Sequence, residues 1–155
     1  MVRAYVGLGS NLGDREATLR DAVDSLSAAP GVTHVTVSTL RETDPVGYLD
    51  QPRFLNAAAA VDTTLRPREL LDLLLRIERE LGRTRDGLRY GPRTIDLDLL
   101  LYGAETVDEP GLTLPHARLH ERLFVLEPLA ELDSSLEVPG KGTVSALLRG
   151  LQSGS

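Results

Sequence analysis

Apolar side chains alternate with small or polar ones at the start of the chain. Their spacing places them on one face of a strand over residues 2–8: Val2, Ala4, Val6 and Leu8. A glycine-rich loop follows. From about Asp14 the apolar positions recur every three to four residues, which predicts a helix that ends at Pro30. Val32–Leu40 is rich in valine and threonine and predicts a second strand.

The middle of the chain continues this pattern. Thr43–Arg53 contains two prolines and a glycine and predicts a long loop, and Phe54–Thr63 predicts a third strand. The next apolar stripe predicts a helix with Pro67 in its first turn and Gly82 at its end: Leu70, Leu74, Ile77 and Leu81. After an arginine-rich loop, Thr94–Tyr102 predicts a fourth strand.

This order of strands and helices is that of a ferredoxin-like βαββαβ core, so we expect an α+β protein with C-terminal additions. The additions are a turn-rich piece over Gly103–Pro115, a short helix near Leu119–Leu132 and a last helix near Val144–Leu151, before a disordered tail over residues 152–155. A chain of 155 residues suits one domain and is short for two. We therefore expect a single domain over residues 1–155.

Composition and charge narrow the possible functions. The absence of cysteine excludes disulfides, thiolate catalysis and cysteine-based metal centres. A formal net charge of −6 argues against a protein that wraps nucleic acid, because such binding depends on neutralising phosphates. No signal peptide or segment of transmembrane length is evident, so we expect a cytoplasmic protein without a membrane partner. No exposed apolar stripe requires a partner chain, so we expect a monomer.

The most informative motif lies in the fourth strand, where Asp96 and Asp98 are two residues apart. Because side chains alternate along a strand, these carboxylates share one face, with Cα atoms about 6.6 Å apart. The opposite, core face is predicted to carry Ile95, Leu97, Leu99 and Leu101. Two carboxylates at this spacing can hold one divalent cation or bridge two, and they repel one another without one. The alternative is a solvated strand face, because a lone D-x-D pair is common by chance.

Arginines gather just before this strand: Arg83, Arg85, Arg89 and Arg93. Lys141 is the only lysine, so genomic base composition can explain the overall preference for arginine, but not this local cluster. Guanidinium groups bind phosphate oxygens bidentately, so arginines beside a metal-binding pair favour a polyphosphate ligand. No Walker A motif is present, and the glycines from Gly7 to Gly13 do not have the spacing of a dinucleotide-binding loop.

An aromatic ring and an amide lie two residues apart on the third strand, Phe54 and Asn56. Together they suit a flat heterocycle, because one can stack on it and the other can hydrogen-bond to its edge; the alternative is that Phe54 belongs to the core. Phe124, the only other phenylalanine, lies in a segment that could close over the same site. His116 ends an extended segment and could reach a phosphate. The other two histidines are interpreted as a bystander in a strand, His34, and an exposed helical residue, His120.

Four segments occur in an order and spacing that together cover essentially the whole chain: Gly9–Leu12, Asp50–Asn56, Gly91–Asp98 and Leu114–His116. With these segments the chain closely resembles the 6-hydroxymethyl-7,8-dihydropterin pyrophosphokinase family, and the string G-P-R-x-x-D-x-D is the most specific part. The resemblance implies a three-layer α-β-α sandwich built on the ferredoxin-like sheet. It also implies transfer of diphosphate from ATP to the hydroxymethyl oxygen of the pterin, with AMP as the other product, in folate biosynthesis.

The resemblance further implies roles for individual residues. Asp96 and Asp98 would hold two magnesium ions that bridge the ATP phosphates, and Arg83 and Arg93 would join them in catalysis. The phosphates would contact Arg83, Arg93, His116 and Arg122. The adenosine pocket would be lined by Leu75, Glu78, Leu99 and Thr113. The pterin would contact Gly9, Thr43, Pro45, Val46 and Asn56 and would stack between Phe54 and Phe124.

Three positions depart from the family pattern. Phe54 stands where tyrosine is common, which keeps the stacking surface and removes a hydroxyl. Asp86 and Gly87 stand in the arginine-rich loop where a basic residue is frequent, and Ala117 stands where a larger side chain is frequent.

Three alternatives stay open from the residues alone. An RNA-binding ferredoxin-like module would need exposed aromatics and a basic sheet face, whereas aromatic residues make up 4% of this chain. Another magnesium-dependent phosphohydrolase or nucleotidyltransferase could use the same carboxylate pair. A non-catalytic regulatory domain is the third. We expect ATP and the pterin as small-molecule partners, and no nucleic acid.

Overall fold

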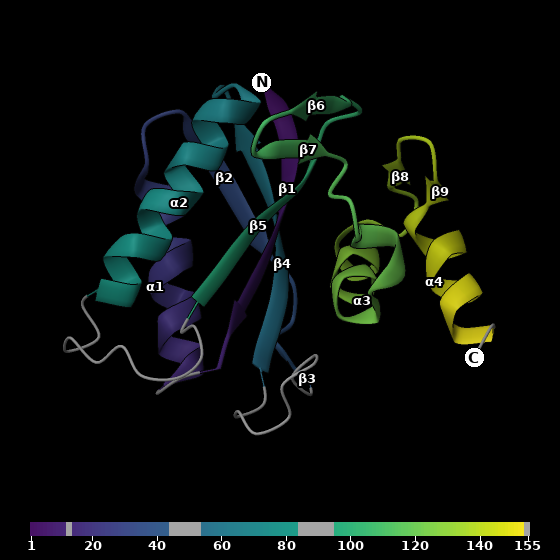
Figure 1. Cartoon of the computed structure of the whole chain (residues 1–155). Coiled ribbons are helices and arrows are strands. Elements are labelled where there is room, and N and C mark those ends of the chain that lie inside the picture. Colours follow the sequence, from purple (N-terminus) through teal and green to yellow (C-terminus); the bar gives the residue numbers. More distant parts are fainter. Residues whose placement is uncertain (12–13, 44–53, 84–94, 154–155) are drawn as a thin grey trace.

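The computed structural model describes residues 1–11, 14–43, 54–83 and 95–153 (Figure 1). The strands in this part of the chain are β1 (Val2–Ser10), β2 (Val32–Val37), β3 (Arg41–Thr43), β4 (Phe54–Thr63), β5 (Ile95–Tyr102), β6 (Val107–Glu109), β7 (Leu112–Leu114), β8 (Glu137–Val138) and β9 (Gly142–Thr143). The helices are α1 (Arg15–Ala28), α2 (Pro67–Arg83), α3 (Leu123–Leu132) and α4 (Val144–Ser153), with a 3₁₀ turn, η1, at Leu119–Glu121. Helices together with an antiparallel sheet make this an α+β protein, as predicted.

The main sheet has the order β2-β4-β1-β5, with antiparallel neighbours throughout. The short strand β3 also pairs with β4, so that Arg41 lies opposite Asn56. β1 and β4 therefore form the centre of the sheet. Two small hairpins, β6-β7 and β8-β9, make separate sheets. None of the described helices combines the length and the apolar composition that a bilayer-spanning segment needs.

The sheet has a packed core on each of its two faces. α1 and α2 lie on one side and α3 and α4 on the other (Figure 1). The four consecutive alanines of β4 are buried alternately in the two cores. Ala57 and Ala59 face α1 and α2, whereas Ala58 and Ala60 face α3 and α4. Small side chains on a central strand leave room for helices on both faces, which explains why this run is a strand despite alanine's weak strand preference.

The fourth predicted strand is β5, but its core face is interrupted. The β1–β5 ladder shifts register between Tyr5 and Val6, which leaves Leu100 as an extra residue on β5. Leu101 was predicted to share the core face of Leu99; it lies instead in the core on the α3 and α4 side. That part of the prediction is wrong because a one-residue shift exchanges the faces of a strand, and β5 is apolar on both.

The second predicted strand also ends earlier than expected, at Val37 rather than at Leu40. Ser38 interrupts the ladder there, because its hydroxyl accepts a hydrogen bond from the backbone N–H of Ala58 at 2.9 Å. The chain then resumes pairing as β3, which begins at Arg41 inside a stretch for which the sequence predicted no strand.

The C-terminal part contains more regular structure than predicted. The segment Gly103–Pro115 holds the hairpin β6-β7. The helix predicted over Leu119–Leu132 is divided into η1 and α3 by the extended backbone of Arg122. Gln152 and Ser153 were predicted to lie in a disordered tail and belong instead to α4, because apolar side chains of that helix, including Leu151, pack against the core.

Candidate functional site

Two cavities meet at β5. The first, termed cavity A, has a volume of about 220 Å³ and lies between β1, β4, β5 and the start of α3; its walls include Gly9, Phe54, Asn56, Arg122 and Phe124. The second, termed cavity B, has a volume of about 460 Å³ and lies between α2, β5 and β7; its walls include Leu75, Glu78, Leu99, Thr113 and His116. Among the described residues, Asp96 and Asp98 are the only two that line both cavities.

The two carboxylates project from the same face of β5, as their spacing predicted. Across the ladder, Asp96 pairs with Gly9 and Asp98 pairs with Gly7. Because glycine has no side chain, β1 places no group beside either carboxylate. Asp98 is exposed and Asp96 is half-buried. The pair is therefore accessible from cavity A and from cavity B.

Two walls of cavity A carry aromatic rings, one from β4 and one from α3. Phe54 and Asn56 are two residues apart on β4 and line the cavity together. Phe124 is the second residue of α3, and Arg122 caps that helix. The Cζ atom of Arg122 lies 5.5 Å from the centroid of the Phe124 ring, within the range of a cation–π contact. The fold thus brings together two rings, an amide and a guanidinium that are distant in the sequence.

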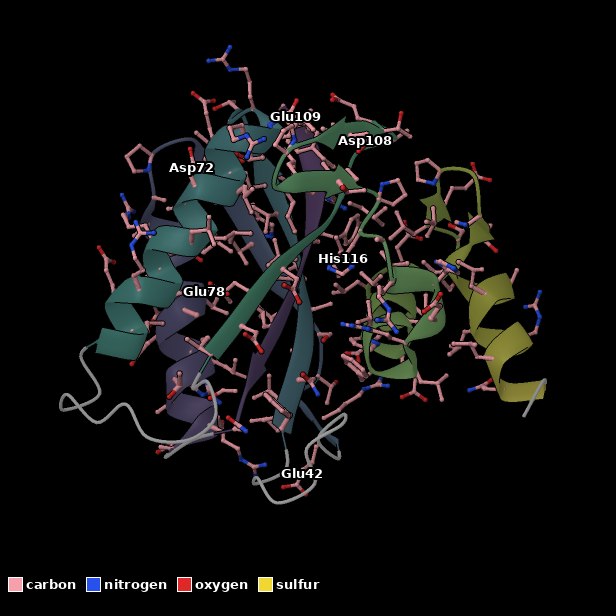
Figure 2. The ribbon with its side chains drawn as sticks, in the orientation of Figure 1. Glu42, Asp72, Glu78, Asp108, Glu109 and His116 are labelled. Atoms are coloured by element: carbon pink, nitrogen blue, oxygen red, sulfur yellow. The ribbon has the colours of Figure 1, made fainter. Side chains whose placement is uncertain are left out.

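One wall of cavity B contains a hydrogen bond between α2 and β5. Oε2 of Glu78 accepts a hydrogen bond of 2.7 Å from the backbone N–H of Leu97. This N–H lies on the edge of β5 that faces away from β1, so Glu78 satisfies a strand edge that would otherwise lack a partner at this point. Figure 2 shows Glu78 on α2, on one side of β5, and His116 on the other.

His116 is held by its backbone and by its ring. Its N–H donates to the carbonyl of Leu100 at 2.9 Å, and Nδ1 accepts from the N–H of Arg118 at 3.3 Å. Burial lowers the pKa of the imidazole, and the nearby Asp98 carboxylate opposes this shift. The ring is therefore neutral near pH 7, with its proton on Nε2, where it can donate to an anionic ligand.

Several predicted site residues lie outside the described part of the chain. They are Pro45, Val46 and Arg93, together with the side chains of Thr43 and Arg83. The roles predicted for them stay predictions. Every other residue of the predicted site lines cavity A or cavity B.

Some cavity residues were missed from the sequence. In cavity B, Leu71 lies beside Leu75 and Glu78, and the three are spaced i, i+4 and i+7 on α2. This second stripe, next to the core stripe, was a readable signal. In cavity A, Leu100 was missed because the bulge in β5 turns it toward the cavity, and no local pattern reveals a bulge.

The carboxylate pair has the chemistry of a magnesium site that is completed by a substrate. Among the described residues there is no group of three or more histidine, aspartate or glutamate side chains that could hold a metal ion by themselves. Mg²⁺ commonly takes one or two carboxylates and fills its remaining positions with water and phosphate oxygens. Two carboxylates between two open cavities fit that coordination.

Comparisons with known proteins agree with this geometry. The family model described as 7,8-dihydro-6-hydroxymethylpterin-pyrophosphokinase (HPPK) matches residues 5–134. A 2-amino-4-hydroxy-6-hydroxymethyldihydropteridine pyrophosphokinase of Bacillus subtilis is 54% identical over 134 residues, which are 86% of this chain and 80% of that protein. A folate synthesis bifunctional protein of Arabidopsis thaliana is 48% identical over 127 residues, 82% of this chain and 26% of its own length.

Solved structures show the same fold. A crystal structure of a Plasmodium falciparum HPPK-DHPS triple mutant with pteroate aligns with a TM-score of 0.75 at 15% identity. The alignment covers 98% of this chain and 43% of the Plasmodium chain, so this chain spans less than half the length of that protein. The family match and the identity to the Bacillus protein show that this chain belongs to the 7,8-dihydro-6-hydroxymethylpterin-pyrophosphokinase family.

Proposed function

We propose that this chain transfers diphosphate from ATP to the hydroxymethyl group of 6-hydroxymethyl-7,8-dihydropterin and releases AMP, as a step of folate biosynthesis. One observation carries the proposal: Asp96 and Asp98 stand at the junction of cavity A and cavity B. A diphosphate transfer needs its donor and its acceptor on either side of one charge-neutralising centre, and this junction offers such a centre.

Cavity A is the proposed pterin site. Phe54 and Phe124 offer two ring faces for a flat bicyclic heterocycle, and the Asn56 amide can both donate to and accept from its edge. Gly9 lets the ring approach the backbone of β1. Thr43, Pro45 and Val46 complete the contacts in the proposal, on the strength of the family resemblance.

Cavity B is the proposed ATP site. Leu75 and Leu99 supply apolar surface for the adenosine, with Glu78 and Thr113 as polar neighbours. His116, which lines the same cavity, carries an Nε2–H suited to a phosphate oxygen. Arg122, in the wall of cavity A, is a second phosphate-binding group. Arg83 and Arg93 complete the phosphate site in the proposal, again from the family resemblance.

Two magnesium ions are proposed at the carboxylate pair. Asp96 and Asp98 would hold them, with the remaining coordination from ATP phosphates and water. Bound there, the ions would neutralise charge on the phosphate oxygens and orient the chain of phosphates.

The residues of the chain then act by position rather than by covalent catalysis. Stacking in cavity A would direct the hydroxymethyl oxygen at the β-phosphorus of ATP, in line with the oxygen that joins the α- and β-phosphorus atoms. A bond forms between the hydroxymethyl oxygen and the β-phosphorus, the bond to the bridging oxygen breaks, and AMP leaves with that oxygen. The hydroxymethyl proton passes to solvent. Arginine and histidine donors stabilise the charge that develops on the phosphates.

We also propose a ferredoxin-like βαββαβ core in a three-layer sandwich, formed as one domain, and a monomeric, cytoplasmic enzyme. The sheet order β2-β4-β1-β5, with helices on both faces, supports the fold part of this proposal (Figure 1).

An assay of product identity tests the function. The purified chain is incubated with ATP, Mg²⁺ and 6-hydroxymethyl-7,8-dihydropterin, and nucleotides are separated by chromatography. We expect AMP and the pterin diphosphate in equal amounts, and no AMP when the pterin is omitted. Release of ADP or inorganic diphosphate without an acceptor would favour a phosphohydrolase or nucleotidyltransferase instead.

A further inference from the structure

A set of charged contacts lies outside the two cavities and joins α3 to the β2–β3 segment. Glu131, in the last turn of α3, accepts three hydrogen bonds. Its Oε2 accepts from the backbone N–H and from the hydroxyl of Thr39, both at 2.8 Å, and its Oε1 accepts from Nη2 of Arg41 at 2.9 Å. Arg41 also approaches Glu127, with Nη1 at 3.8 Å from Oε1. Both oxygens of the Glu131 carboxylate are thus engaged.

These contacts lie between two walls of cavity A. Phe124, Glu127 and Glu131 are spaced i, i+3 and i+7, which places them along one side of α3. On the opposite side of the contact, Arg41 belongs to β3 and pairs with Asn56 of β4. The contacts therefore connect the helix that carries one aromatic ring of cavity A to the strand pair that carries the other ring and the amide.

The first turn of α3 lacks one of its helical hydrogen bonds. Pro128 lies inside the helix and has no N–H to donate to the carbonyl of Phe124, four residues before it. The position of the Phe124 ring therefore depends more on how the rest of the helix is attached to the sheet. Glu131 adds to that attachment one turn after the proline, alongside the buried side chains of Leu126 and Leu129.

The contact between Arg41 and Glu131 is too exposed for its main effect to be on the free energy of unfolding. The side chains of Arg41 and Glu131 keep 37% and 33% of their surface exposed, and ion pairs of this kind add little to the free energy of unfolding. The hydrogen bonds from Thr39, with Arg41, lower the pKa of Glu131, so the carboxylate is charged at neutral pH. A directional contact that adds little to the free energy of unfolding can still set the distance between the two elements that it joins.

We propose that Glu131 and Arg41 are positioning residues for the pterin, which fix the separation of the Phe54 and Phe124 walls of cavity A. This role rests on the proposed function of that cavity. Neither positioning residue is among the residues that line it, so both act through α3 and β3. Cavity B has no described lining residue from either element, and α3 adjoins the proposed ATP site only through Arg122 at its start, so we expect ATP binding to depend on this contact far less than pterin binding.

Steady-state kinetics of Glu131→Gln tests the role. The amide retains the size of the side chain but removes the charge that holds Arg41. We expect the KM for the pterin to rise about three- to sixfold, the effect of losing one partly exposed charged contact, with the KM for ATP unchanged within about twofold. Arg41→Gln should give the same pattern, and the double variant should be no more impaired than the more impaired of the two single variants, because both changes remove the contact between Arg41 and Glu131.

A matched control breaks an ion pair elsewhere. Arg68 on α2 contacts Glu109 on β6 at 2.7 Å, with 42% and 51% of the side chains exposed, and Figure 2 shows Glu109 at the hairpin β6-β7. Glu109→Gln should leave the pterin KM unchanged, because the hairpin β6-β7 lines cavity B and not cavity A. A wild-type pterin KM in Glu131→Gln would overturn the proposal, as would equal rises in both KM values with a lower melting temperature. Failure of the wild-type chain to form AMP with the pterin would refute the proposed function, and this role with it.

Discussion

Gly9 and Asn56 lie opposite one another on β1 and β4, and a Cβ atom at position 9 would stand 2.7 Å from Oδ1 of Asn56. Non-bonded carbon and oxygen atoms do not approach this closely without displacement. The amide of Asn56, which is 9% exposed, therefore occupies space that only glycine leaves open.

Gly9→Ala should weaken pterin binding selectively. The added methyl group would push the Asn56 amide out of line with the heterocycle, and we expect affinity to fall about tenfold, the equivalent of one good hydrogen bond. Calorimetry with the pterin and a non-hydrolysable ATP analogue measures this. Gly150→Ala is the control, because nothing lies within 4 Å of its added Cβ. Unchanged pterin affinity in Gly9→Ala would contradict the placement of Asn56 at the ring edge.

Removal of either carboxylate at the cavity junction should abolish most of the turnover. We expect Asp96→Asn and Asp98→Asn each to lower kcat by at least about a hundredfold, because a metal-held phosphate is worth several kcal/mol in such transfers. The melting temperature should stay level or rise, since the change relieves repulsion between like charges. AMP release is measured against Mg²⁺ concentration, with Asp108→Asn on β6 as the exposed-carboxylate control (Figure 2). Near-normal turnover in either site variant would rule out the metal assignment.

Local patterns were sufficient for the elements that carry most of the site. β4 begins at Phe54 and ends at Thr63, as predicted, because turn residues in the sequence on both sides mark its ends, although its four alanines favour a strand only weakly. The first helix begins after Asp14, whose side chain accepts a hydrogen bond from the N–H of Ala17 at 3.0 Å. The shared face of Asp96 and Asp98 follows from strand alternation alone.

Features that depend on pairing between distant segments could not be predicted. The bulge that displaces Leu101 is a property of the β1–β5 ladder and not of either strand. The strand β3 forms because the chain pairs again with the first residues of β4, where Arg41 lies opposite Asn56, after Ser38 has interrupted β2. The proximity of Phe54 and Phe124 to one cavity was raised as a possibility from the sequence and implied by the family resemblance, but nothing in the local sequence of either residue required it.

Pterin binding should strengthen when nucleotide and magnesium are present. Asp96 and Asp98 line both cavities, so bound metal and phosphates would complete a wall that the two sites share. Without nucleotide, the ions would have only two carboxylates of the described chain as ligands, which is few for Mg²⁺. We expect pterin affinity to increase at least about tenfold with Mg²⁺ and an ATP analogue, measured by calorimetry. Equal affinity with and without nucleotide would refute this coupling.

Arg3 and Asp62 form a bidentate ion pair between β1 and β4, far along the strands from the carboxylates of β5. Arg3 Nε donates to Asp62 Oδ1 at 2.8 Å and Nη2 donates to Oδ2 at 3.1 Å. The two residues also lie directly opposite in the ladder. The hydrogen bonds and charge of Arg3 lower the pKa of Asp62 below its usual value of 3.8.

The ion pair between Arg3 and Asp62 should stabilise the folded protein only at pH values at which the Asp62 carboxyl group is ionised. A carboxylate whose pKa is lower in the folded state stabilises fully above its unfolded pKa, and the contribution is lost as pH falls through the folded pKa. Asp62→Asn should thus lower the melting temperature at pH 7 by about 1–3 °C, a small effect because Arg3 is 57% exposed, and the difference should shrink as the pH falls below about 3.8 and through the lower folded-state pKa of Asp62. Calorimetric scans across this range measure it, with exposed Asp72 on α2 as the control position (Asp72→Asn; Figure 2). A difference that stays constant down to pH 2 would show that the ionised pair is not its source.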